Sequence, residues 1–243
     1  MMKFFRSARK NLSKKGNTKD YLIYAFGEIF LVMVGILLAL QVNNWNQSRI
    51  ERKTEAKALI DLLEEFKLNK SRIEEKQTLR IAVVSKLENY VNLLSKGEAS
   101  YSDFQEFHFS QFVIGMTNPS SGVIDALTSS GDLRLISNSS LKHLLSDWKN
   151  QAGNLYENEE ILWDVTISYT DYFQEFIVDS RYNWKDWDTK KLNDAFNLLQ
   201  VKTLYRNKLV SYQGCNKIVV EECKLILESL DKIINLLEEE IKK

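Results

Sequence analysis

Residues 21–42 form an apolar run in which Glu28 is the only ionisable side chain besides two tyrosines. At about 1.5 Å per residue, a helix of this length is roughly 33 Å long and covers the ~30 Å hydrocarbon core of a bilayer. Tyr21, Tyr24 and Trp45 lie near the two ends of the run, where aromatic membrane-interface anchors are typically found. The run predicts a transmembrane helix rather than the buried core helix of a soluble protein.

A cleaved signal peptide also begins with basic and then apolar residues. This run is longer than the usual apolar region of a signal peptide, however, and its exit at 38–42 lacks a small-x-small cleavage site. We therefore expect that the run is not cleaved.

The flanks of this run predict its orientation. Seven Lys and Arg precede the run and four follow it in residues 43–57. Since the more basic flank stays in the cytoplasm, we expect an inner-membrane protein with a cytoplasmic tail (1–20), a transmembrane helix (21–42) and a periplasmic domain (43–243).

The segment 24–46, which begins Tyr24-Ala-Phe-Gly-Glu-Ile and ends Gln-Val-Asn-Asn-Trp-Asn46, resembles the N-terminal signature of a family of small single-pass membrane proteins from Bacteroidota. Residues 130–138, Ser-Gly-Asp-Leu-Arg-Leu-Ile-Ser-Asn, resemble a second and weaker segment of that family. The family is known only as a domain of unknown function. The resemblance therefore implies an anchored topology and a location in the bacterial envelope, and it implies no activity.

Glu28, the acidic residue inside the span, is a candidate functional residue, because placing a carboxyl group in hydrocarbon costs free energy. Gly27, Leu31 and Gly35 follow one another at intervals of four, and Glu28 lies seven residues before Gly35. Small residues let a partner helix approach, and a protonated carboxyl can hydrogen-bond across the contact. We expect an intramembrane helix contact at Gly27, Glu28, Leu31 and Gly35; a proton-carrying carboxyl and simple snorkelling of Glu28 are the alternatives.

The sequence predicts an all-α fold, since the whole chain of 243 residues contains only 1 Pro and 9 Gly, too few for the many tight turns of an all-β protein. Apolar residues at spacings of three and four predict a long helix from 43 to about 95, ended by Gly97. A terminal helical region over 192–243, interrupted only by Gly214, is expected to pack antiparallel to it in a helical bundle. The apolar residues of the helix from 43 to about 95 form a seam along one face. In the middle of this seam the residues are polar, namely Lys70, Gln77 and Arg80.

Helix-start signals divide the middle of the chain. Ser102 to Gln105 reads as a capping box that opens a helix through about Val113. Ser121, Asn138 and Asp188 are expected to cap three further helices. The helix that Asn138 is expected to cap carries an apolar face near its end and an acidic stripe away from that face. The stripe comprises Glu157, Glu160, Asp164, Asp171 and Glu175. A solvated face is the simpler interpretation of the stripe, and a surface for a cation or basic partner is the alternative.

The sequence gives no catalytic motif. His108 and His143 lack ligand-like partners at helical spacing, and Cys215 and Cys223 would pair only if Gly214 broke their helix. An aromatic-rich stretch at Tyr182, Trp184 and Trp187 is a candidate ligand or partner surface, although aromatic residues more often close a core.

With 33 basic and 33 acidic residues, the chain has no net field to attract nucleic acid. We therefore predict a non-enzymatic scaffold without metal or cofactor, which contacts the bilayer and another envelope protein or a second copy of itself. An accessory subunit of a proton-motive-force-coupled complex that uses Glu28, and a periplasmic sensor module, are the alternative functions.

Overall fold

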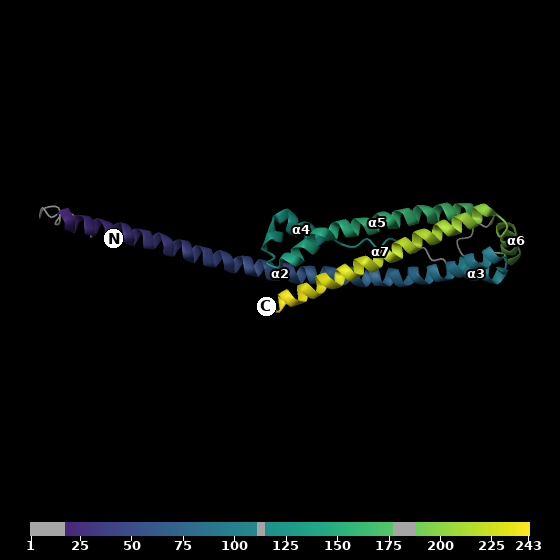
Figure 1. Cartoon of the computed structure of the whole chain (residues 1–243), viewed down its shortest axis with the longest axis horizontal. Coiled ribbons are helices and arrows are strands. Elements are labelled where there is room, and N and C mark those ends of the chain that lie inside the picture. Colours follow the sequence, from purple (N-terminus) through teal and green to yellow (C-terminus); the bar gives the residue numbers. More distant parts are fainter. Residues whose placement is uncertain (1–17, 111–114, 177–187) are drawn as a thin grey trace. The chain divides into compact units, whose positions relative to one another are not determined.

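The computed structural model describes residues 18–110, 115–176 and 188–243. Throughout these ranges the regular structure is helical, which confirms the predicted all-α class (Figure 1). The elements are α2 (Thr18–Lys96), α3 (Tyr101–Ser110), α4 (Gly122–Ser130), the 3₁₀ turn η1 (Asp132–Leu135), α5 (Ser139–Gln174), α6 (Thr189–Leu199) and α7 (Thr203–Ile241). The chain divides into two compact units, residues 1–55 and 56–243, and each is described by itself. Helix α2 contributes to both.

The second unit is built around the part of α2 that follows Glu55, together with α5 and α7. Phe66 packs on Trp148 with ring centroids 4.9 Å apart, and Arg80 pairs with Glu159. The residue that comes later in α2 contacts the residue that comes later in α5, so these two helices run parallel. Their facing side chains form one continuous apolar core with those of α7.

Helix α7 runs antiparallel to α2, as the sequence predicted. Lys67 of α2 pairs with Glu238 at 2.6 Å, whereas Glu88, farther along α2, pairs with Lys217 at 2.6 Å. Tyr90, near the end of α2, shares a 3.1 Å hydrogen bond with the hydroxyl of Tyr205 at the start of α7. Contacts at both ends and along the length therefore fix the antiparallel order.

Several helix ends follow their local signals. Gly97 has φ +73°, and its N–H and that of Glu98 donate to the carbonyls of Leu94 and Leu93 at 3.2 and 2.9 Å. This is the Schellman arrangement, so the predicted stop at Gly97 is confirmed. The Asn138 side chain accepts from the N–H of Leu141 at 3.0 Å, and Asp188 accepts from Lys190 at 2.8 Å, so both predicted caps are confirmed as well.

Two expected boundaries were wrong. The capping box of α3 is formed by Ser100 and Asp103, not by Ser102 and Gln105: Ser100 N–H donates to the Asp103 carboxylate at 2.8 Å, and Asp103 N–H donates to Ser100 Oγ at 3.3 Å. The expected end of that helix near Val113 lies outside the described residues. Helix α7 passes through Gly214 without a break, and the interruption falls instead between α6 and α7, at residues 200–202.

Candidate functional site

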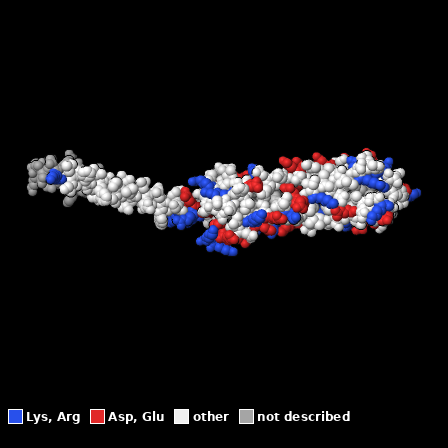
Figure 2. Space-filling model, in the orientation of Figure 1, with Lys and Arg blue, Asp and Glu red and all other residues white. Residues whose placement is uncertain are grey.

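The apolar part of α2 is the most exposed hydrophobic segment of the described chain. An 18-residue window within this helix has a mean hydropathy of 2.2, and none of it is buried. Leu31 and Trp45 are 64% and 63% exposed. Figure 2 shows this stretch almost entirely white, without the charged side chains that cover the second unit. The segment is long and apolar enough to cross a membrane.

The expected intramembrane contact face lies on this segment and is open. Apart from chain neighbours and the backbone of the helix itself, no atom of the described residues lies within 4 Å of the position where a Cβ would stand on Gly27 or Gly35. Leu31 is exposed, and Glu28 is half-buried. The two glycines of this face are therefore open to a close approach. Of the expected interface anchors, Tyr21 and Tyr24 belong to α2 but their side chains lie outside the described part, and Trp45 has the Arg49 guanidinium 5.8 Å from its ring centroid.

The polar middle of the α2 seam finds partners within the bundle. Lys70 pairs with Asp231 at 2.6 Å, and the Gln77 amide donates to the Val220 carbonyl at 3.4 Å. Hydrogen bonding to Asp231 raises the pKa of Lys70. Lys70 and Gln77 thus interrupt the apolar seam of α2 because they bind α7.

An ion pair that no sequence pattern indicated is buried in the core. The guanidinium of Arg80 lies 2.7 Å from the Glu159 carboxylate, and both side chains are only 1% exposed. The same carboxylate accepts from the N–H of Thr117 at 2.7 Å and from its hydroxyl. Nearby, burial raises the pKa of the Cys223 thiol to about 11, against the opposing effect of Arg80. The pair joins α2 and α5 to the connector that precedes α4.

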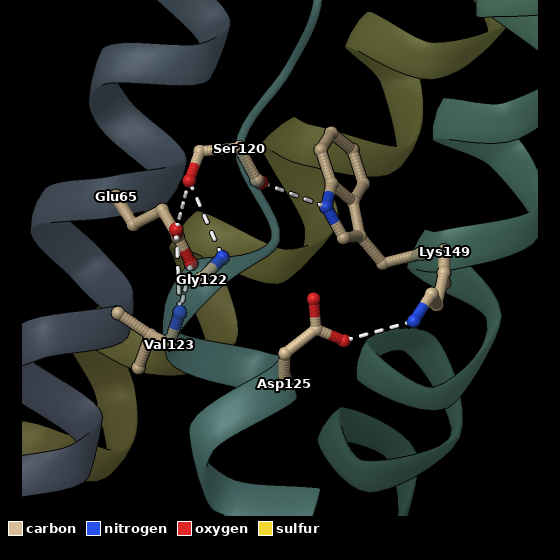
Figure 3. A network of polar contacts seen from close by, with 7 residues as sticks. Glu65, Ser120, Gly122, Val123, Asp125 and Lys149 are labelled. Atoms are coloured by element: carbon tan, nitrogen blue, oxygen red, sulfur yellow. Dashed lines mark hydrogen bonds and ion pairs between the residues drawn. The ribbon is translucent and has the colours of Figure 1, made fainter.

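That connector, residues 115–121, is held by polar side chains at a second point. Asn69 makes two 2.8 Å hydrogen bonds with the backbone of Ser120, one to its carbonyl and one from its N–H. The Trp148 indole N–H donates to the same carbonyl at 3.2 Å. Figure 3 shows Glu65 of α2 beside Ser120 and the start of α4, where it accepts from the Val123 N–H at 3.2 Å.

The expected cap of α4 is therefore corrected. Ser121 occupies the N-cap position but makes no side-chain capping bond. The N–H groups of the first turn instead reach Glu65, from α2, and Ser120 Oγ, which accepts from Gly122 at 3.3 Å. Lys149 of α5 pairs with Asp125 in the same turn at 3.0 Å (Figure 3). Side chains distant in sequence thus anchor this nine-residue helix.

A third polar cluster surrounds His108 of α3. Its Nδ1 lies 2.8 Å from the Phe104 carbonyl, which only accepts, so Nδ1 carries the proton. The lone pair of Nε2 accepts from the Tyr169 hydroxyl, and the Tyr205 hydroxyl lies farther away, at 3.3 Å. The ring also stacks on Phe173 with centroids 4.4 Å apart. Burial lowers the pKa of His108 to about 3. His108 is therefore a neutral core histidine that ties α3 to α5 and α7.

The acidic stripe of α5 is exposed, as expected of a solvated face. Three exposed apolar side chains, Tyr156, Trp163 and Ile167, lie at intervals of seven and four on the same helix. They stand beside Glu160 and Asp164 of the stripe. This combination of apolar and acidic side chains is a candidate partner surface on the bundle.

The remaining expected candidates are an aromatic stretch and two cysteines. Tyr182, Trp184 and Trp187 lie outside the described residues. Cys215 and Cys223 are free and lie on one unbroken helix. Within the described ranges, no group of three His, Cys, Asp or Glu side chains is arranged to hold a metal ion.

Compared with known protein families, curated proteins and solved structures, the chain matches none of them. The resemblance of residues 24–46 to a Bacteroidota membrane-protein family therefore stays a prediction.

Proposed function

We propose that this protein is a single-pass membrane-anchored scaffold of the bacterial envelope, with its N-terminal tail in the cytoplasm and its helical bundle in the periplasm. The observation that supports this most strongly is that no residue of the apolar window in α2 is buried. An exposed apolar surface of this size in water would drive aggregation, whereas a bilayer covers it. The larger number of Lys and Arg residues before the span supports the orientation.

The anchor is proposed to associate with another membrane helix through Gly27, Glu28, Leu31 and Gly35. The two glycines leave room for a close backbone approach, and the partner is a second copy or another envelope protein. On the bundle, the acidic face with Tyr156 and Trp163 is the proposed surface for a basic partner.

Fractionation and crosslinking of the full chain in native membranes test the two parts separately. The protein should resist alkaline extraction, and a protease added to the periplasmic side should reach the bundle. Gly35→Leu should reduce crosslinked complexes, because the side chain blocks close approach. Met33→Leu, about half a helical turn away, is the matched control and should leave crosslinking unchanged. A freely extractable protein contradicts the anchor, and unchanged crosslinking of Gly35→Leu contradicts the contact face.

The second candidate function, an accessory subunit of a proton-driven complex, rests on the carboxyl group of Glu28 within the apolar segment. The variant Glu28→Gln distinguishes the scaffold from the accessory subunit. An amide keeps hydrogen bonds across a helix contact but carries no proton, so complex formation should survive in a scaffold. Loss of a proton-dependent function with the complex intact would favour the accessory subunit.

A further inference from the structure

The C-terminal end of the apolar segment carries a basic and aromatic cluster on one helical face. Trp45, Arg49 and Arg52 are spaced by four and three residues, so they share a face of α2, and Lys53 adjoins it. All four side chains are exposed. Besides lying over the Trp45 ring, the Arg49 guanidinium donates to the Asn46 side chain at 3.5 Å. Glu51 lies on another face and accepts from Gln47 at 3.1 Å.

The spacing of charges along this helix matches a whole bilayer. Between Lys19 and Arg49 the only ionisable side chains besides tyrosines are Asp20 and Glu28. The thirty residues from Lys19 to Arg49 correspond to about 45 Å of helix, and a bilayer including its headgroups is about 40–45 Å thick. Residues 43–48, at the end of the span, are uncharged. When Lys19 lies at one headgroup layer, Arg49 therefore reaches the opposite one.

We propose that Arg49, Arg52 and Lys53, with Trp45, bind the phosphate groups of anionic phospholipids in the leaflet on the bundle side. The proposal rests on the membrane anchor proposed above and adds its lipid ligand. Guanidinium groups donate paired hydrogen bonds to phosphate oxygens, and an indole ring favours the depth at which those phosphates lie. The stacking of Arg49 on Trp45 holds the guanidinium beside the ring at this depth. The cluster would fix both the depth of the span and the lipids around it.

The test places the full chain in preformed vesicles of neutral phosphatidylcholine, with spin-labelled phosphatidylglycerol confined to the outer leaflet. Protease accessibility first verifies that the bundle faces outward. The measured quantity is the association constant of the labelled lipid with the protein. Arg49→Gln, Arg52→Gln and Lys53→Gln should each lower it by about fivefold, and the triple variant should lower it further.

A matched triple variant removes the same charge from the bundle surface, by Lys190→Gln, Lys191→Gln and Lys232→Gln, three exposed residues. It should bind the labelled lipid as the unchanged protein does. Equal lipid association in the two triple variants overturns the lipid site. Failure of every variant and of the unchanged protein to insert contradicts the anchor instead, so the two proposals fail in distinguishable ways.

Discussion

The Arg80–Glu159 pair places two opposite charges where water is excluded. Removing such charges from water costs several kcal/mol for each ion, which their attraction offsets only with good geometry and further hydrogen bonds. Glu159 has these, because Thr117 donates to it from its N–H and its hydroxyl. The pair therefore fixes the register of α2 against α5, since a shift along either helix would leave a buried charge unpaired.

Arg80→Met should lower the free energy of unfolding by about 3–5 kcal/mol, because it leaves the Glu159 carboxylate buried without its cation. Urea denaturation of the full chain in detergent, followed by circular dichroism, measures the loss. The double variant Arg80→Met with Glu159→Leu should lose less than the sum of the two single variants. A loss below about 1 kcal/mol for Arg80→Met contradicts this account.

His108 makes stability depend on pH. Its folded pKa lies below the ordinary value of 6.5, so below that pH the unfolded chain binds a proton that the folded chain does not. The stability that neutral, buried His108 contributes is therefore fully present above pH 6.5 and is lost as the pH falls toward 3. From pH 7 to pH 5, His108 should remove about 1–2 kcal/mol.

The variant His108→Gln should show a shallower loss of stability than the unchanged protein over this pH range, because glutamine takes up no proton. Thermal unfolding at several pH values measures the slope. His143→Gln is the control, since His143 is exposed on α5. Parallel slopes for the unchanged protein and His108→Gln would show that His108 is protonated as readily in the fold as outside it.

Helix α4 is too short to be stable alone, since isolated helices of fewer than about 12 residues are marginal in water. In its first turn the Val123 N–H donates to the carboxylate of Glu65, which is carried by α2. A negative side chain at a helix N-terminus both accepts these hydrogen bonds and complements the helix dipole.

Glu65→Ala should therefore destabilise the protein by about 1–2 kcal/mol and increase hydrogen exchange in residues 120–125 more than elsewhere. Glu64→Ala, at the exposed neighbouring position, should change neither quantity by more than about 0.5 kcal/mol. Uniform exchange across the bundle in Glu65→Ala would mean that the carboxylate supports the fold generally rather than α4 in particular.

The same elements show what the sequence could and could not predict. The caps at Asn138 and Asp188 and the stop at Gly97 follow from neighbouring residues, so local pattern was sufficient. Ser100 and Ser102 both precede a suitable partner by three residues, and the prediction of Ser102 was wrong because the same local pattern also fits Ser100.

Long-range contacts were not readable from the sequence. Glu65 and Val123, or Arg80 and Glu159, are far apart in the chain, and no local signal links them. Gly214 was expected to interrupt the last helix, but a glycine costs a helix only about 1 kcal/mol, which the packing of α7 outweighs. The break at 200–202 contains neither Gly nor Pro and had no marker.

On the scale of the whole molecule, burial is confined to one unit. Every buried hydrophobic residue of the described chain lies at Ala58 or beyond, within the unit 56–243. The described part of the first unit contributes none. The core thus has no need of the apolar segment for its own packing.

A fragment of residues 56–243 should fold without the anchor and remain soluble without detergent. Circular dichroism and thermal unfolding should show a helical protein with one cooperative transition. The full chain under the same conditions should require detergent. An aggregated fragment, or one without a cooperative transition, would show that residues 1–55 are needed for folding.

The polar contacts between α2 and α7 also have a mechanical consequence. Three ion pairs, Lys67–Glu238, Lys70–Asp231 and Glu88–Lys217, are distributed along two antiparallel helices. Tension along the axis of α2 would load them together, in shear, while the side chains of the core resist sliding past one another. Forced unfolding is governed by the unfolding rate, and in this geometry several contacts must break in one step. A force applied along the bundle would therefore be distributed over all of these contacts at once.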